Sequence, residues 1–395
     1  MSTLKVDGIR SNSASSDAIT LADDGTATAK LTTVNSVTMP NGGFLSNRNL
    51  IINGAYTVNQ RGVTGHGSSG YRVVDRWTMS AGGLNNSMHQ YQVDITAGDL
   101  PYTKGFRKMY RLTNDGQNAD TNDYIQAVQH IEAQNIATSG WNYVSSSSNI
   151  TLSFYVKASV SQTYHGYLQT HDGTSKTNSF SFALTAGTWT KVTKTFPGDS
   201  GITINNDNGV GFTVHFTPFM GTDYTASSVT DGAWQTYASG ARTTDQTSTW
   251  MTTAYSTFEL TGVQLEVGSV ATDFEHRSFS QELALCERYC FRIGSDSPQY
   301  ASLAGGVASS STNCKSFIVF PRQMRSAPTM SYSNVTIDDD VASYSGSRIN
   351  GTNDLIIGTD RADIHWDVGS FTSAGRSFRV ITSAAGGYIQ GDAEL

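Results

Sequence analysis

Two short stretches of sequence decide the fold class of this chain: Thr151–Lys157, TLSFYVK, and Val210–Phe216, VGFTVHF. An apolar residue stands at every second position of both stretches: Leu152, Phe154 and Val156, then Val210, Phe212, Val214 and Phe216. This period of two places the apolar side chains on one face of a strand. Both stretches are therefore predicted to be half-buried β-strands.

The composition of the 395-residue chain favours the same class. Glu is scarce, while Gly, Ser, Thr and Asn are abundant, which suits short strands joined by polar turns. Only 15% of the residues are charged and the net charge is -7, so the composition excludes nucleic acid as the natural partner. The length is enough for two or three domains. We expect an all-β protein.

The termini and the cysteines bear on where the chain folds. No run of about 18 apolar residues occurs and the first residues, MSTLKVDGIR, contain no apolar segment. We therefore expect neither membrane insertion nor a secretory signal, and folding in a cytoplasm. The three cysteines, Cys286, Cys290 and Cys314, lack the spacing of metal ligands and are interpreted as buried free thiols.

Two segments between residues 120 and 267 predict further strand features. In the run 258–267 the apolar parity switches at Gly262, as a β-bulge would produce. The segment 122–134 fits either a helix or a strand, and we interpret it as a strand because its neighbours are strands.

One helix is predicted, over 278–292. Ser278 and Gln281 have the spacing of a capping box, and Leu283, Cys286, Tyr289 and Cys290 form an apolar stripe. Further alternating segments follow this helix and predict a second, smaller β domain. The strands before residue 44 are too short to close a core alone, so they need the rest of the chain or other copies of it as partners.

Two longer stretches carry a family resemblance. RNLIINGAYTVNQRG at 48–62, continuing to Trp77, and ELTGVQLEVGSVATDFEHRS at 259–278 resemble the opening and the closing strand of a jelly-roll module of bacteriophage tail fibres. The first residues, MSTLKVDGI, and the last four, DAEL, are similar to termini of tail fibres from phages that infect aquatic bacteria, including cyanobacteria.

The resemblance implies an architecture and a set of partners. It implies a tail-attachment or shaft segment at 1–44, a carbohydrate-binding-like jelly-roll β-sandwich at 45–277, a connecting helix at 278–292 and a C-terminal β domain at 293–395 as the distal tip. It further implies a homotrimer in the virion tail that docks on tail proteins through its N-terminal segment and adsorbs to a host surface glycan such as lipopolysaccharide. We expect the trimer contact to include Leu283, Leu285, Cys286 and Tyr289.

Sugar recognition needs flat aromatic faces together with polar groups on loops. Candidate glycan-binding residues are Tyr164, Tyr167, His171 and Asp172 in one strand-and-turn segment, Trp234 and Tyr237 in a long polar stretch, and Tyr344, Arg348, Arg361 and His365 in the C-terminal domain. The alternative interpretation of each aromatic residue is a core or trimer contact.

Asn53 and Glu266 are candidate ligands of a structural calcium ion, since they lie at comparable ends of the jelly-roll module. The alternative places Asn53 in a turn and Glu266 in an ordinary strand hydrogen bond.

Catalysis is not expected. The sequence contains no GxSxG, HExxH, Walker or CxxC motif, and Glu259 and Glu266 would stand about 23 Å apart on a strand, too far for a glycosidase pair. Two other functions stay open: a purely structural tail or capsid appendage, and a polysaccharide depolymerase.

Overall fold

The computed structural model describes residues 47–83, 87–116, 118–294, 296–339, 349, 351–368 and 373–395, with five short strands in the first 46 residues. Three of these form an antiparallel sheet: β1 (Gly8–Ile9), β2 (Ile19–Leu21) and β3 (Ala27–Ala29). The other two pair with each other: β4 (Thr33–Val34) and β5 (Val37–Thr38). The side chains expected to bind tail proteins or other copies at 1–44 lie outside the described residues.

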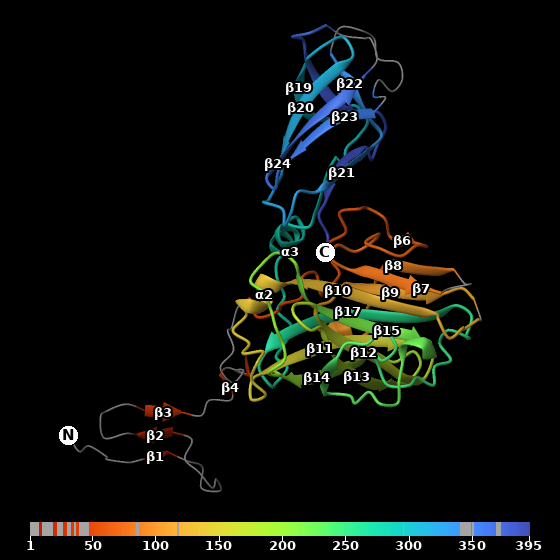
Figure 1. Ribbon diagram of the computed structural model, residues 1–395, viewed down its shortest axis with the longest axis vertical. Coiled ribbons are helices and arrows are strands. Elements are labelled where there is room, and N and C mark those ends of the chain that lie inside the picture. Colours follow the sequence, from red (N-terminus) through yellow and green to blue (C-terminus); the bar gives the residue numbers. More distant parts are fainter. Residues whose placement is uncertain are drawn as a thin grey trace, which may run out of the picture.

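Two six-stranded antiparallel sheets form a jelly-roll β-sandwich (Figure 1), and the all-β prediction is confirmed. Sheet 1 has the order β16 (Trp234–Thr236), β13 (Lys176–Leu184), β12 (Gln162–Thr170), β15 (Val210–Met220), β10 (Tyr124–Glu132) and β7 (Thr78–Gly82). Sheet 2 has the order β14 (Thr190–Pro197), β11 (Asn149–Ala158), β17 (Ser256–Val267), β9 (Lys108–Asn114), β8 (Met88–Asp94) and β6 (Gly65–His66). The stretches 151–157 and 210–216 lie in β11 and β15, one in each sheet.

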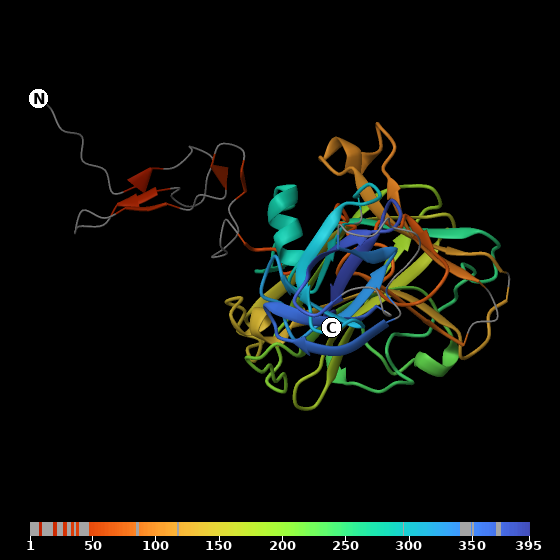
Figure 2. The same ribbon diagram turned by 90° about the horizontal axis from the view of Figure 1, so that it is seen from above.

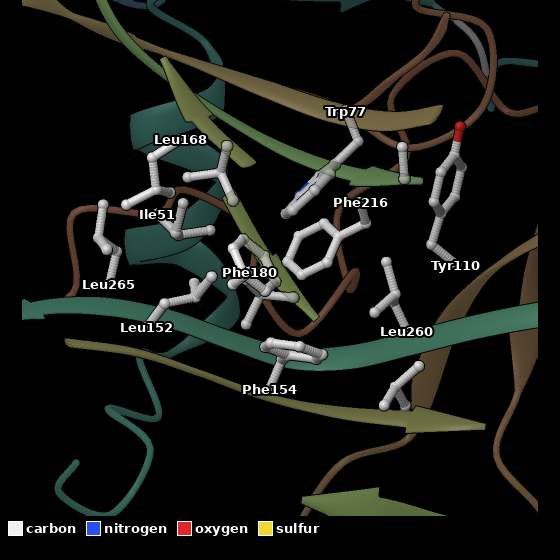
Figure 3. Packing of buried hydrophobic residues seen from close by; sticks show 14 of the residues in the cluster. Ile51, Trp77, Tyr110, Leu152, Phe154, Leu168, Phe180, Phe216, Leu260 and Leu265 are labelled. Carbon is white, nitrogen blue, oxygen red and sulfur yellow. The ribbon is translucent and has the colours of Figure 1, made fainter. Parts of the chain in front are cut away.

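The core of the sandwich is built from the alternating apolar residues of both sheets. The ring of Phe154 on β11 meets that of Phe216 on β15 with centroids 4.8 Å apart, and Trp77 packs on Phe216 at 6.2 Å. Figure 3 shows these three rings between the sheets, with Leu152 and Leu260 beside them. Because the period-two pattern supplies one apolar face per strand, the two faces bury each other.

The predicted β-bulge at Gly262 is confirmed. Between Ser153 and Tyr155 on β11, the register on β17 advances by three residues, from Gln264 to Thr261. Gly262 has a φ of +60°, and a Cβ at this position would lie 2.6 Å from the ring of Phe106. The extra residue returns Val263 and Leu265 to the core side, where both are buried.

The strand interpretation of the segment 122–134 is confirmed for most of its length. Residues 124–132 form β10, paired with both β7 and β15. The chain then turns into the short helix α2 (Ala133–Ala137). Two other short helical turns, α1 (Leu100–Thr103) and η1 (Thr222–Tyr224), lie in loops. None of the helices in the described ranges is long and apolar enough to span a membrane.

The chain after the sandwich forms two more antiparallel sheets. Sheet 3 has the order β22 (Val335–Asp338), β25 (Ser377–Thr382), β19 (Ser302–Ala308), β20 (Asn313–Val319), β24 (Arg361–Asp367) and β23 (Gly351–Ile357). A smaller sheet has the order β18 (Cys290–Ile293), β26 (Tyr388–Asp392) and β21 (Thr329–Ser333). The view from above in Figure 2 shows these strands lying over the sandwich, with helix α3 (Phe279–Cys286) beside them.

Helix α3 has the predicted capping box, in which Ser278 and Gln281 bond each other reciprocally, but it is shorter than expected. It ends at Cys286, because Cys290–Ile293 pair as β18 with the last strand of the chain. The strand pairing replaces the final helical turn that the sequence pattern predicts.

The apolar stripe expected at a trimer seam is mostly buried within the single chain. Cys286 is 0% and Tyr289 1% exposed, whereas Leu283 is half-buried and Leu285 is exposed. The ring of Tyr289 lies 3.5 Å from the guanidinium of Arg76, a residue of the sandwich. The prediction that Cys286 and Tyr289 contact another copy is therefore wrong for these two residues, because the junction of the domains covers them.

A network of buried charges ties the C-terminal part to the sandwich. Arg61 lies 3.1 Å from Asp75 and 3.0 Å from Asp392, and Arg76 pairs with Glu394. Burial is the main cause that raises the pKa of Asp75, to about 6. The last residues of the chain thus return to the sandwich, and sheet 3 points away from it (Figure 1).

Candidate functional site

A straight row of charged and aromatic side chains crosses the outer face of sheet 2. The strand register places Tyr91 on β8 opposite Arg111 on β9, Arg111 opposite Glu259 on β17, and Glu259 opposite Lys157 on β11. Directly opposed residues point to the same side of a sheet. The row, at about 4.8 Å per strand, spans roughly 14 Å from Tyr91 to Lys157. Trp189 continues it, with its ring centroid 4.9 Å from the Lys157 ammonium nitrogen.

The charges in this row form ion pairs with one another. Arg111 Nε lies 2.7 Å from Glu259 Oε1, and Lys157 Nζ lies 2.8 Å from Oε2 of the same carboxylate. Glu259 is buried, while Arg111 and Lys157 are half-buried. The carboxylate therefore fixes two cationic side chains whose donors reach the surface.

Tyr255 stands at one end of this surface in an unusual state. Its side chain is 75% exposed although it is large and aromatic, and its φ of +55° lies in the left-handed region. Such a conformation costs free energy in a non-glycine residue, and it is more frequent at functional positions. Tyr255, Tyr91, Val93, Arg111, Thr113 and Asp115 line a cleft of about 280 Å³.

A second cleft, of about 260 Å³, opens at the other end of the same face. It is lined by Tyr155 and Lys191 from the sheet and by Phe106, Phe274 and His276 from loops. The Phe106 ring contacts the rings of Phe274 at 4.8 Å and His276 at 5.0 Å between centroids. The Gly262 bulge places bare backbone beneath this aromatic group, so the bulge shapes the cleft.

The arrangement can bind a ligand that has both apolar faces and hydroxyl groups. The rings of Tyr91 and Tyr255 offer flat surfaces, and Arg111 and Lys157 offer donors. Within the described ranges, no group of three or more His, Cys, Asp or Glu side chains is placed to hold a metal ion.

Two residues predicted to bind a glycan are buried instead. Tyr164 is 0% exposed and packs in the core, with its hydroxyl bonded to the carbonyl of Val160. Tyr167 is 2% exposed on the outer side of sheet 1, stacked on His215 at 4.0 Å between ring centroids. Neither ring is accessible to a ligand, and both predictions are corrected to packing roles.

The other residues predicted in this part of the chain follow β12 or lie in and after the edge strand β16 of sheet 1. His171 is exposed and Asp172 half-buried, and Asp172 accepts hydrogen bonds from the backbone and side chain of Asn205. Trp234 packs against the core and donates from its indole nitrogen to the carbonyl of Pro197. Tyr237 is half-buried, with its backbone bonded to Ser175 in the turn after Asp172. Trp234 lies on the core side of the sheet and His171 reaches Thr213 on the outer side, so these side chains do not gather on one face, and the glycan-binding roles predicted for His171, Asp172, Trp234 and Tyr237 stay predictions.

The C-terminal candidates are described in part. Arg361 is exposed and pairs with Asp360 at 2.8 Å, and His365 is half-buried on the same strand, β24. Tyr344 and Arg348 lie outside the described residues.

Asn53 and Glu266, the candidate calcium ligands, are both buried and bonded to the protein. The amide oxygen of Asn53 accepts from the backbone of Val58, and its nitrogen donates to two carbonyl groups. The carboxylate of Glu266 accepts from the backbone and hydroxyl of Thr272 and from Gln264. These contacts match the alternative interpretation, a turn residue and a strand residue held by hydrogen bonds.

Three histidines that the sequence shows as scattered gather on the outer side of sheet 1. The hydroxyl of Thr213 lies 2.8 Å from His130 Nδ1 and 2.7 Å from His171 Nε2, and His215 lies on the same strand as Thr213. Burial lowers the pKa of His130 to about 3 and that of His215 well below its ordinary value. The rings of His130 and His215 are therefore neutral at pH 7.

Sequence reasoning missed the row on sheet 2 because its members come from four strands between residues 91 and 259. A partial signal exists, since Tyr91, Arg111, Lys157 and Glu259 all occupy positions that alternate with buried apolar or core-side residues in their own strands. Which of these positions become neighbours depends on the sheet order, which the pattern alone does not specify.

Comparison with known proteins gives structural neighbours only. No family model matches the sequence, and no curated protein matches it. One solved structure to which the chain is similar is the enzymatically active domain of tailspike protein 4 of bacteriophage CBA120, with 11% identity and a TM-score of 0.30 over 55% of this chain. The matched part spans 21% of that domain's length.

Two smaller neighbours are matched over nearly their whole length. The N-terminal cellulose-binding domain of Cellulomonas fimi β-1,4-glucanase C has 12% identity and a TM-score of 0.26, covering 53% of this chain and 96% of the domain. The CBM22-1 xylan-binding domain of Paenibacillus barcinonensis Xyn10C has 10% identity and a TM-score of 0.26, covering 52% of this chain and 94% of the domain.

Proposed function

We propose that this protein binds a glycan, without cleaving it, on the outer face of sheet 2. The observation that carries the proposal is the pair Tyr91 and Tyr255 beside the fixed cation Arg111. Tyr255 is 75% exposed in a left-handed conformation, so the fold holds an aromatic face in solvent at a cost in free energy. A ligand with apolar C–H patches and hydroxyl groups matches that surface.

The ring of Tyr91 has a defined position that supports this role. It lies over Gly65 of the edge strand β6, where a Cβ would come within 2.5 Å of the ring. A side chain held in this way loses little conformational entropy on binding, so more of the contact contributes to affinity.

We further propose that the protein acts as a homotrimeric tail fibre in the virion tail of a phage, adsorbing to a host surface glycan such as lipopolysaccharide. The support is the sequence resemblance of 48–62 and 259–278 to tail-fibre modules. Three identical sites on one fibre bind a repetitive glycan with an avidity that a single shallow site lacks.

The first test measures adsorption to host cells. Fluorescently labelled protein is expected to bind cells that carry the glycan and to compete with phage for adsorption. Tyr255→Ala is expected to weaken this binding at least tenfold. Tyr300→Ala is the matched control, because Tyr300 is also exposed (55%) with a φ of +70° but belongs to the C-terminal part. No binding by the wild type would favour a purely structural appendage.

The second test separates binding from cleavage. Purified lipopolysaccharide or capsular polysaccharide is incubated with the protein, and new reducing ends are measured over several pH values and divalent cations. We expect no release above the buffer blank. If the wild type released reducing ends and a variant of this chain did not, the protein would be a depolymerase instead of a non-cleaving binding protein.

A further inference from the structure

Sheet 3 exposes an apolar face. Val307 on β19, Phe317 and Val319 on β20, and Ile356 on β23 are 52%, 65%, 66% and 63% exposed. Single exposed apolar residues are common on proteins, but several gathered on one sheet face mark an interaction surface.

One row across this face contains both apolar and charged residues. The register places Ile356 opposite Asp363, Asp363 opposite Phe317, Gly305 opposite Arg379, and Arg379 opposite Asp338. Gly306 pairs with Ser316, so Phe317 and Gly305 are neighbours in the middle of the row. The order is therefore Ile356, Asp363, Phe317, Gly305, Arg379, Asp338.

This order is self-complementary about its centre. A threefold axis parallel to the strands, passing over the boundary between β20 and β19, brings the β20 half of each copy against the β19 half of the next copy. Phe317 then faces Gly305, and the acidic Asp363 faces the basic Arg379. We infer that copies of this chain meet through the face of sheet 3 that carries Phe317, with Asp363 of one copy beside Arg379 of the next.

The chemistry of each facing pair agrees with this contact. Gly305 lacks a side chain, and a Cβ built there would have only the carbonyl oxygen of Phe378 nearby, at 3.8 Å, so space for a facing ring exists above it. Arg379 already lies 2.6 Å from Asp338, and a guanidinium can bind a second carboxylate through its other donors. The aromatic ring fills the space over glycine, while the charges at the rim set the register.

The inference rests on the proposed homotrimer, because it names the surface through which the copies meet. It places the contact on sheet 3 instead of on helix α3, whose Cys286 and Tyr289 are covered within the chain.

Disulfide trapping tests the geometry in the full chain. The double variant Asp363→Cys/Arg379→Cys has its new cysteines three strands apart within one sheet, roughly 14 Å, too far for a bond within the chain. Between facing copies the same two positions are opposed. Mild oxidation with copper–phenanthroline is expected to give covalent species that stop at the trimer on a non-reducing gel, while Asp363→Cys alone gives no trimer.

Light scattering of full-length variants gives a second, independent measurement. We expect Phe317→Asp to abolish the trimer at micromolar concentration with unchanged circular dichroism, and Leu285→Asp to leave it intact. A wild-type trimer that survives Phe317→Asp and forms no trapped species would overturn this contact while leaving the trimer standing. A wild-type monomer would instead refute the homotrimer itself. That result would leave glycan binding by the outer face of sheet 2 to be decided by its own binding assay.

Discussion

Glu394→Ala is expected to destabilise the junction between the sandwich and the C-terminal part. Arg76 is 1% exposed, and its guanidinium pairs with the Glu394 carboxylate, which also lies 3.4 Å from Arg61. Removing the carboxylate leaves a buried cation without its counter-charge. Breaking a buried ion pair in this way costs about 3–5 kcal/mol, whereas an exposed pair contributes about 0–1 kcal/mol.

The assay is urea unfolding of full-length protein, followed by tryptophan fluorescence. We expect the free energy of unfolding to fall by about 3–5 kcal/mol in Glu394→Ala. Asp360→Ala is the control, because Asp360 pairs with Arg361 at the surface, where both side chains are more than half exposed; we expect the free energy of unfolding to change far less than in Glu394→Ala, because solvent screens the exposed pair. A Glu394→Ala variant as stable as the Asp360→Ala variant would show that the buried charges do not stabilise the junction.

Three further predictions follow from burial and backbone conformation. The folded pKa values of His130 and His215 lie below the unfolded value of 6.5, so the unfolded chain binds more protons than the folded one below pH 6.5. Stability is then expected to be full above that pH and to fall as the pH decreases, by about 1.4 kcal/mol per pH unit for each histidine until its folded pKa is reached, which for His130 is about 3. The raised pKa of Asp75 opposes this with one proton between about pH 6 and its ordinary pKa of 3.8. In His130→Gln, the plot of the free energy of unfolding against pH should lose a slope equivalent to about one proton. An unchanged slope would contradict the lowered pKa of His130.

Gly262→Ala should lower the free energy of unfolding by about 1–3 kcal/mol, because of the left-handed φ of this residue and the clash of the new Cβ with Phe106. The loss should exceed that in Gly187→Ala, where the new Cβ meets nothing within 4 Å. Equal losses in denaturant titrations would show that the clash at Gly262 is relieved. Burial raises the pKa of all three cysteine thiols, that of Cys314 to about 11, so a thiol reagent such as DTNB at pH 8 should label none in the native protein and all three after unfolding; fast native labelling would contradict their burial.

Much of the sandwich could be predicted because its information is local. Alternation in 151–157 and 210–216 specifies which side of each strand faces the core between the two sheets, although nearly every residue on both sides of these strands is buried. The parity switch at Gly262 specifies an inserted residue within a single segment. Both depend on neighbours one or two positions away, which the sequence displays directly.

The errors arise where distant segments decide the outcome. The helix predicted over 278–292 ends early because residues 290–293 pair with Tyr388–Asp392, about a hundred residues away. The aromatic density around Tyr164 and Tyr167 suggested a ligand site, but those rings pack on Phe182 and His215 from other strands. Composition indicates that aromatic residues are present and does not tell which face of a sheet they occupy.

The residues of the candidate site also depend on the pairing of distant segments. Tyr91, Arg111, Glu259 and Lys157 belong to four separate segments, and only the order of strands in sheet 2 makes them neighbours. Predicting such a row requires the register of three strand pairs at once, and a slip of one residue in any of them would turn a side chain to the core.

Glycan recognition by the outer face of sheet 2 can be measured by binding of the full-length protein to an array of bacterial surface glycans, with wild type, the Tyr91→Ala/Tyr255→Ala variant and Tyr300→Ala side by side. We expect wild type and Tyr300→Ala to bind the same glycans, the double variant to lose them, and every bound glycan to be recovered at its original length. Equal binding by all three proteins would contradict the placement of the site on sheet 2, and shortened glycans would contradict binding without cleavage.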